Sequence, residues 1–389
     1  MRQLGTILLK GLRALRTAWD IAGITLLIVL VLIGGAMAVM ATRAHGPSDT
    51  ARADHPYHGE AWYRQYLAEY ERSLQMEWRP YIYWRRRPMA GAFVNIDSVG
   101  FRRTVQPAAG TTTPRRVYFL GGSTMWGTGQ RDAGTIPSQV ASALAQQGAR
   151  GVEITNLAET GYVFTQEFVQ LLMLLRSGAR PDVVVFYDGI NDAVSSATTP
   201  TCGLPQNETR RRFEFALGRL LNQRGTRELR AMLSAAREQL AAGPLGGAAG
   251  APVDTATVAH SLVDCYARTA VPLEALGRLY GFQVLYFWQP TPRTTSKQLT
   301  TYEVAVLDTL SHSAMNRMLR AVDRRVTVQM DSAMKPIAGE RFQNLVGLFK
   351  GDTSTVWLDF IGHVTERSNT KIAAAMAGPI AKALAAAKP

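Results

Sequence analysis

The sequence predicts an α/β fold in which a parallel β-sheet is covered by helices on both faces. Four short, strongly apolar segments bounded by Gly, Asn or Asp have the composition of buried strands, namely residues 117–120, 152–157, 183–187 and 282–288. Helical patterns separate the first three of them, at 136–147 and 165–177. Strands that alternate with helices in this way form parallel sheets, and their functional side chains gather at the carboxyl ends of the strands.

The N-terminal region predicts a membrane anchor. Residues 21–41 form an uncharged apolar run that is long enough, at about 1.5 Å per residue, to cross a hydrocarbon core of about 30 Å. The leader, residues 1–20, carries four basic residues against one acid, which predicts a cytoplasmic N-terminus and an extracytoplasmic, periplasmic remainder. A cleaved signal peptide ending near Ala36-Met37-Ala38 is the alternative, and it leads to the same location.

Residues 42–94 are predicted to be a linker and approach segment, followed by a catalytic domain over 95–389. The first part, 42–60, is rich in Pro, Gly and charged residues, so His55 and His58 are interpreted as solvated linker residues rather than metal ligands. A helix is expected over about 61–76. The aromatic and basic run at 78–88 either packs as part of the approach segment or stacks on sugar rings or lipid headgroups.

A long interruption at about 194–274 separates the third and fourth strands. Its amphipathic helical patterns predict an insertion that is either a cap over the substrate site or a structural spacer. It contains the only two cysteines, Cys202 and Cys265, which form a disulfide if the domain is exported and are otherwise two buried thiols.

The composition excludes some classes of protein. A hydrophobic fraction of 47% argues against a disordered chain. The net charge of +13 favours an anionic partner, such as acidic lipid headgroups or anionic glycans. Nucleic acid is not expected, because the chain has no zinc-finger spacing, basic heptad region or aromatic RNA-binding motif. Nothing in the sequence has the pattern of a dinucleotide or metal site, so no cofactor is predicted.

The ends of the first three strands deliver the residues of an acyl-transfer site. Gly121-Gly122-Ser123-Thr124 follows the first strand, where a serine at a strand-to-helix turn suits a nucleophile, although the same residues form ordinary turns and phosphate cradles. The second strand leads to Gly161 and the third to Asn191, which supply a backbone and a side-chain N–H for an oxyanion. The alternative for Asn191 is turn formation.

His363 is the predicted general base. Of the other five histidines, three fall in the linker region and two in helical patterns without a neighbouring signal, namely His45, His55, His58, His260 and His312. His363 precedes a final Ala-rich helix, with Asp359 four residues upstream as the acid that orients its ring.

The order of GGST, N-x4-G, GxND and a C-terminal Asp and His resembles the SGNH hydrolase superfamily. The match covers about residues 95–385, including the segment 95–102 (NIDSVGFR) that precedes the nucleophile strand. The resemblance implies a flavodoxin-like three-layer fold, Ser123 as nucleophile, Ser123 N–H with Gly161 and Asn191 as the oxyanion hole, and His363 as base. The family usually places Asp three residues before His, so either a one-residue bulge brings Asp359 to the ring or a backbone carbonyl orients a dyad.

Three functions agree with these residues. The first is a serine esterase that removes a small acyl group from an extracytoplasmic glycan or lipid-linked substrate, an expectation that follows from the resemblance. The second is an acetyltransferase that passes the same acyl-serine intermediate to a sugar hydroxyl. The third is a catalytically silent binding module of the cell envelope. The oligomeric state and the natural ester are not predicted.

Overall fold

The computed structural model describes residues 54–110, 113–199, 201–223, 226–242, 254–308 and 314–387, with a few separate helical residues between Trp19 and Gly35. The chain divides into two compact units, Met1–His55 and Pro56–Pro389. Most of the predicted membrane segment, 21–41, lies outside the described residues, as does the small-residue motif at 36–38. In the described part of the chain, no helix has the length and apolar character needed to cross a membrane.

The second unit is built on a five-stranded sheet in the order β4-β3-β5-β6-β7, and every neighbouring pair of strands is parallel. The strands are β3 (Arg115–Gly121), β4 (Val152–Asn156), β5 (Val183–Asp188), β6 (Gln283–Trp288) and β7 (Phe342–Asn344). Numbered along the chain, the order is 2-1-3-4-5, which is the flavodoxin-like arrangement. The predicted fold class and its four strands are confirmed, whereas the three-residue edge strand β7 was not predicted.

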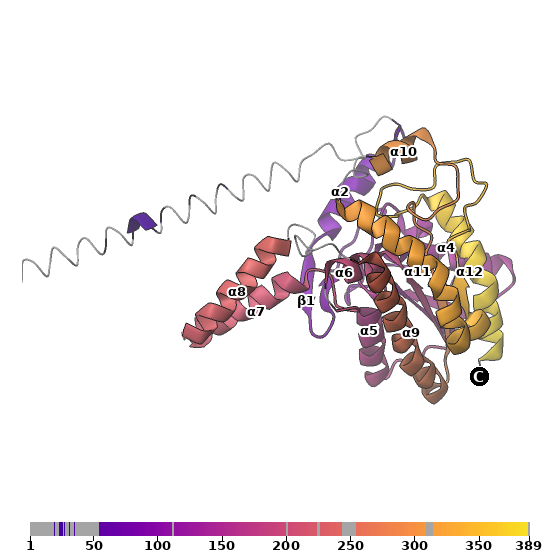
Figure 1. The fold of residues 1–389 in the computed structure, drawn as a ribbon. Helices are drawn as coiled ribbons and strands as arrows, with labels where there is room; N and C mark the ends of the chain where they lie inside the picture. Colours follow the sequence, from indigo (N-terminus) through magenta and orange to yellow (C-terminus); the bar gives the residue numbers. More distant parts are fainter. Residues whose placement is uncertain are drawn as a thin grey trace, which may run out of the picture. The chain divides into compact units, whose positions relative to one another are not determined.

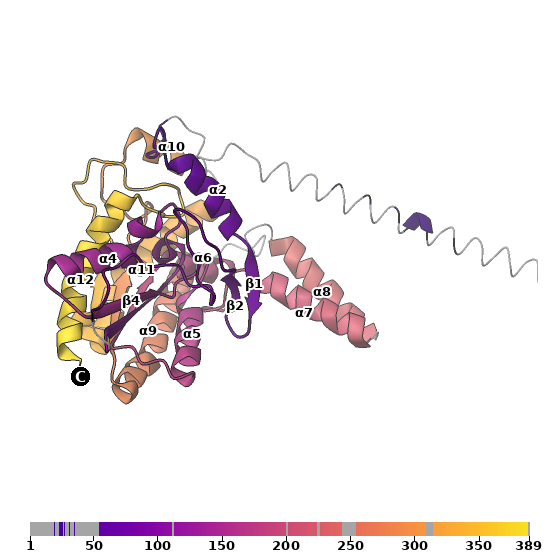
Figure 2. The ribbon, with the colours of Figure 1, turned by 180° about the vertical axis from the view of Figure 1, so that it is seen from behind.

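Helices cover both faces of this sheet (Figure 1 and Figure 2). Successive strand residues point to opposite faces, so Val183 and Val185 of β5 join one apolar cluster while Val184 and Phe186 join the other. The first cluster is completed by α4 (Ile136–Gln146) and α12 (Glu366–Ala386). The second is completed by α5 (Phe164–Arg176), α9 (Thr255–Tyr280) and α11 (Ala314–Ala338).

The approach segment belongs to the same compact unit as the sheet. It contains α2 (Tyr63–Ser73), as predicted, and an unpredicted antiparallel hairpin of β1 (Met76–Arg79) and β2 (Tyr83–Arg86). Tyr57 is buried, and its hydroxyl accepts a hydrogen bond of 2.6 Å from the backbone N–H of Glu366. Tyr66 accepts one of 2.7 Å from Gly129. The compact unit therefore begins at Pro56, well before the boundary predicted at residue 95.

The segment predicted as an insertion, 194–274, has two parts. Helices α7 (Glu208–Gln223) and α8 (Thr226–Ala242) pack against each other as a helical hairpin (Figure 1). The residues from 255 onward belong to α9, which covers the sheet and is part of the core rather than of a cap. Cys202, just ahead of α7, forms a disulfide with Cys265 of α9, so the two parts are covalently linked.

Short helices complete the described unit. They are α3 (Ser123–Trp126) and α6 (Ile190–Thr198), which follow β3 and β5, the 3₁₀ turns η2 (Asp132–Gly134) and η3 (Gly339–Arg341), and α10 (Thr301–Asp308). Because α3 and α6 begin directly after parallel strands, their first residues lie at the carboxyl edge of the sheet.

Candidate active site

Ser123, His363 and Asp359 form a hydrogen-bonded triad at the carboxyl edge of the sheet. The Oγ of Ser123 lies 2.7 Å from Nε2 of His363, across 240 positions of sequence. The other ring nitrogen, Nδ1, is hydrogen-bonded to Oδ2 of Asp359. With Nδ1–H donated to the carboxylate, Nε2 is left as the acceptor for the serine O–H, which is the tautomer that a general base requires. Ser123 and His363 are 8% and 6% exposed, so the pair is largely shielded from water.

The Asp359 carboxylate reaches the ring because the chain turns around it. Its Oδ1 accepts hydrogen bonds from the backbone N–H groups of Ile361, Gly362 and His363, at 2.9, 3.0 and 3.2 Å. Gly362 has φ +102, a left-handed conformation that glycine adopts readily, and this accommodates the extra residue between Asp and His. Of the two predicted alternatives, the structure shows the carboxylate, not a carbonyl, beside Nδ1.

The charge on Asp359 is maintained by its neighbours. Burial alone would raise the pKa of Asp359, but His363 and the hydrogen bonds from its ring and backbone lower the pKa below the usual value for an aspartate. The carboxylate is therefore ionised at neutral pH and can stabilise a positive charge on the His363 ring.

The Asn191 side chain lies directly beside the nucleophile. Its Nδ2 donates a 2.8 Å hydrogen bond to the carbonyl of Tyr162, which leaves its second N–H for a ligand. A Cβ added at Gly122 would meet Nδ2 at 2.1 Å, so the amide packs against the backbone that leads into Ser123. Ser123 is the first residue of α3, and its backbone N–H has no partner within that helix. Both N–H groups lie next to Ser123, where donors to an oxyanion would be needed.

Gly161 lies on the β4–α5 loop beside the same amide. It has φ +77, in the left-handed region that favours glycine. A Cβ added there would lie 3.4 Å from the Trp84 ring and 3.6 Å from Oε1 of Gln206. Gln206 donates to the Asn191 amide, and the Tyr162 carbonyl accepts from that amide, so Gly161 is near both Gln206 and Asn191 in space.

The aromatic and basic run at 78–88 is mainly a packing element. Arg85 and Arg86 are 2% and 0% exposed. Arg85 donates to the carbonyls of Leu157 and Ala158, at 3.0 and 3.2 Å, and so secures the loop that carries Gly161. Trp78 at the start of the hairpin remains 63% exposed. The packed interpretation therefore holds for Arg85 and Arg86, whereas Trp78, Tyr81 and Arg87 are exposed and available to a ligand.

Two buried arginines hold the one-turn helix that carries the nucleophile, a role that sequence reasoning missed. The guanidinium groups of Arg86 and Arg102 lie 3.7 and 4.3 Å from the ring centroid of Trp126, the last residue of α3. Arg86 also forms an ion pair with the buried Glu159 on the oxyanion loop. The β1–β2 hairpin therefore connects the nucleophile helix to the loop that carries Gly161.

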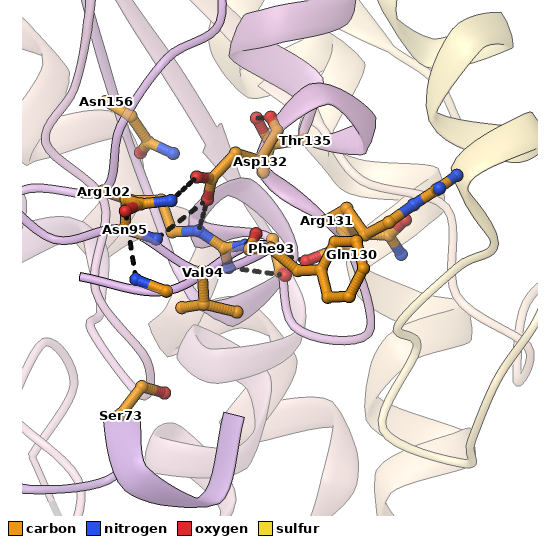
Figure 3. A network of polar contacts seen from close by, with 12 residues as sticks. Ser73, Phe93, Val94, Asn95, Arg102, Gln130, Arg131, Asp132, Thr135 and Asn156 are labelled. Carbon is orange, nitrogen blue, oxygen red and sulfur yellow. Dashed lines mark hydrogen bonds and ion pairs between the residues drawn. The ribbon is translucent and has the colours of Figure 1, made fainter. Parts of the chain in front are cut away.

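The contacts of Arg102 show the structural role of the segment 95–102, NIDSVGFR (Figure 3). Its Nε donates to Oδ1 of Asp132 at 2.9 Å, and its Nη groups donate to the carbonyls of Gly127 and Gln130 at 3.1 and 2.7 Å. Asn95, the first residue of the segment, donates to the other Asp132 oxygen at 2.7 Å. The segment thus binds the carbonyl groups of the loop that follows the nucleophile helix and fixes that loop to Asp132.

Replacing Arg102 with alanine is expected to destabilise the fold by about 3–5 kcal/mol, because it leaves the Asp132 charge buried without its partner. The free energy of unfolding of the full-length chain in urea measures this loss. Arg103→Ala is the matched control, since the Arg103 side chain is exposed. Equal stability of the two variants would contradict the assigned role.

Three acidic side chains are buried together behind the site. Glu167 of α5, Asp188 at the end of β5 and Asp192 of α6 are 0%, 3% and 7% exposed. Tyr266 donates a 2.9 Å hydrogen bond to Asp188, and a side-chain hydrogen bond joins the carboxyl groups of Glu167 and Asp188. Burial, followed by repulsion from Asp188 and Asp192, raises the pKa of Glu167 well above its usual range, and burial raises the pKa of Asp188 to about 7.

These raised pKa values predict that the native state loses stability as pH rises. Below about pH 4 the carboxyl groups are protonated in both states, whereas at higher pH the unfolded chain ionises first and the folded chain keeps its protons. Glu167→Gln removes the contribution of Glu167 to this difference, so we expect the variant to be more stable than the wild-type chain at pH 8, with a smaller gain at pH 4. Thermal unfolding between pH 4 and 8 measures it, and a gain that does not increase with pH would contradict the assignment.

Of the histidines that the structure describes, His363 alone belongs to the triad. His58 and His260 are exposed. His55 is buried, so the prediction that it is a solvated linker residue is wrong, while His45 and His312 lie outside the described residues. Within the ranges that the structure describes, no group of three His, Cys, Asp or Glu side chains is arranged to hold a metal ion.

The fold and the site together define an α/β protein with a Ser–His–Asp triad and adjacent oxyanion donors. No protein-family model and no curated protein matches the chain. The chain is similar to three bacterial structures at 10–14% identity: a lipolytic G-D-S-L family protein from Veillonella parvula, an acetylxylan esterase from Geobacillus stearothermophilus and an extracellular lipase from Streptomyces rimosus. Their TM-scores are 0.36, 0.33 and 0.31, and the matches cover 69%, 70% and 69% of this chain and 97%, 96% and 99% of the others. At TM-scores below 0.4, these likenesses by themselves do not establish a function.

Proposed function

We propose that the chain is a serine ester hydrolase of the SGNH type that removes a small acyl group from an extracytoplasmic glycan or lipid-linked saccharide. The observation that carries the proposal is the Ser123 Oγ held 2.7 Å from His363 Nε2, with Asp359 on the opposite ring nitrogen. A serine, a base within hydrogen-bond reach and an acid that orients the base are the parts that nucleophilic catalysis needs.

The reaction follows from these positions. Ser123 Oγ attacks the ester carbonyl while His363 Nε2 takes its proton, and the carbonyl oxygen becomes an oxyanion beside Ser123 N–H, Gly161 N–H and Asn191 Nδ2. The C–O bond to the alcohol then breaks, and His363 donates its proton to the departing oxygen. A water molecule then attacks the acyl-serine and loses a proton to His363. The bond between the acyl carbon and Ser123 Oγ breaks, His363 returns the proton to Oγ, and the carboxylic acid leaves.

The extracytoplasmic, membrane-anchored location is part of the proposal. It is supported by the uncharged run at 21–41, by the basic leader and by the Cys202–Cys265 disulfide, since disulfides persist in oxidising compartments. The test is a fusion of alkaline phosphatase after residue 389, expressed in a bacterial host, because this enzyme is active only outside the cytoplasm. We expect the fusion to be active, and an inactive fusion would overturn the proposed location.

The enzymatic proposal is tested by hydrolysis of p-nitrophenyl acetate with the full-length chain, its Ser123→Ala form and its His363→Ala form. A fluorophosphonate probe is added in parallel, because covalent labelling requires an activated nucleophile. We expect turnover and labelling by the wild-type chain and neither by the Ser123→Ala form. A wild-type chain that is no faster than the Ser123→Ala form and does not react with the probe would overturn the proposal.

A further inference from the structure

The polypeptide between α6 and α7 crosses the oxyanion hole. Gln206, in the turn two residues before α7, donates a 3.2 Å hydrogen bond from Nε2 to Oδ1 of Asn191. Its own oxygen lies 3.6 Å from the position of a Cβ on Gly161. Gln206 therefore lies against two of the three predicted oxyanion donors, although it comes from a segment that the nucleophile, oxyanion and base motifs do not include.

This contact decides which way the Asn191 amide faces. An asparagine amide presents a donor on one side and an acceptor on the other, and only its N–H groups stabilise an oxyanion. The Gln206 N–H occupies the acceptor side, and the Tyr162 carbonyl accepts one of the two Nδ2 protons. Together they leave the second Nδ2 proton beside Ser123. The hydrogen bond to Oδ1 also polarises the amide and strengthens the remaining donor.

Several contacts hold Gln206 in this position. The Cys202–Cys265 disulfide links its segment to α9, the Oγ of Ser195 donates to the carbonyl of Leu204, and Pro205 is buried. Gly203 packs so closely that an added Cβ would meet Oγ1 of Thr165 at 2.5 Å and Sγ of Cys265 at 3.3 Å. The segment is therefore attached to the core helices immediately before Gln206.

We propose that Gln206 is a positioning residue of the oxyanion hole, which orients the Asn191 amide towards Ser123, and that the Cys202–Cys265 disulfide keeps it there. The inference rests on the proposed ester hydrolysis, and it assigns the insertion a direct part in that reaction. Reduction of the disulfide then lowers activity by releasing Gln206, which makes the oxidising compartment a condition for full turnover.

The test measures kcat and KM for p-nitrophenyl acetate with the full-length chain. We expect Gln206→Ala to lower kcat by about 10-fold with KM nearly unchanged, a fraction of the 10²–10³-fold loss that follows removal of a whole oxyanion donor. Gln206→Glu is expected to lose more than Gln206→Ala, because a carboxylate only accepts hydrogen bonds and draws Nδ2 away from Ser123. A residue with a merely structural role would tolerate the isosteric glutamate better than the truncation.

A double-mutant cycle connects the effect to Asn191. In an Asn191→Ala background, Gln206→Ala is expected to cause less than about a 2-fold further loss, since the amide that it orients is absent. The Cys202→Ser, Cys265→Ser double variant is expected to have the same kcat as Gln206→Ala, under conditions in which circular dichroism shows it to be folded. Adding Gln206→Ala to this double variant is expected to leave its kcat unchanged. Arg210→Ala, an exposed change in the same insertion, is the control with unchanged kcat.

Two outcomes separate this inference from the proposed function. If the wild-type chain hydrolyses the ester and Gln206→Ala has the same kcat, or its loss adds fully to that of Asn191→Ala, the positioning role is overturned while the esterase stands. If the wild-type chain neither turns over the ester nor reacts with the fluorophosphonate, both are overturned.

Discussion

Asp359→Asn is expected to lower kcat for p-nitrophenyl acetate by about 10⁴-fold, the loss seen when the acid of a serine–histidine–aspartate triad is replaced by its amide. The asparagine keeps an oxygen for the backbone N–H groups of residues 361–363, so the turn persists. Its NH₂ group, however, favours the His363 tautomer with the proton on Nε2, and that tautomer cannot accept the proton of Ser123.

Steady-state kinetics at neutral pH measures this effect, and circular dichroism confirms that the variant is folded. Asp97→Asn is the matched control, because Oδ1 of the exposed Asp97 likewise accepts two backbone hydrogen bonds in a turn, at 2.9 and 2.8 Å, away from the triad. Turnover of Asp359→Asn within a few fold of the wild type would mean that the carboxylate is dispensable and that Ser123 and His363 act as a dyad.

Gly122→Ala is expected to lower kcat by about 10²–10³-fold, as if an oxyanion donor had been removed. Gly122 has φ −81 and ψ −155, a conformation open to alanine, so the substitution does not strain the backbone. The new methyl group meets Nδ2 of Asn191 at 2.1 Å, and this amide must move away from Ser123. Its hydrogen bonds to Tyr162 and Gln206 are broken by that movement.

Combination with Asn191→Ala gives a sharp check on this mechanism. The double variant is expected to be no slower than Asn191→Ala alone, because the group that the methyl displaces is already absent. Gly347→Ala, where an added Cβ meets nothing within 4 Å, is the control for adding a methyl group to a glycine. Undiminished turnover of Gly122→Ala would show that the Asn191 amide is not required where the structure places it.

Features encoded by local sequence were predicted well. The four longer strands are short apolar runs bounded by turn residues, and their alternation with helices is enough to predict a parallel sheet, because each pattern lies within a few consecutive residues. The same holds for Ser123 and Asn191, which come within three residues of a strand end, and for helix α2. In a parallel sheet the carboxyl ends share one edge, so position along the chain predicts proximity in space.

Features that depend on contacts between distant segments were decided only by the tertiary structure. Because one extra residue separates Asp359 from His363, the sequence allowed either a triad or a Ser–His dyad. The structure shows the Asp359 carboxylate beside Nδ1, where the turn at Gly362 brings it. The buried roles of Arg86 and Arg102 depend on Trp126, and the compact unit begins at Pro56 because the approach segment packs on residues far along the chain.

What the sequence determined by itself is therefore the class of fold, the candidate nucleophile and base and the ends of the strands that carry the oxyanion donors. Only the tertiary structure decided which acid completes the triad, that Cys202 and Cys265 pair, and that Gln206 reaches Asn191. The physical reason is that backbone periodicity and turn chemistry are local, whereas the direction of a side chain and the partner that it meets depend on how the whole chain packs.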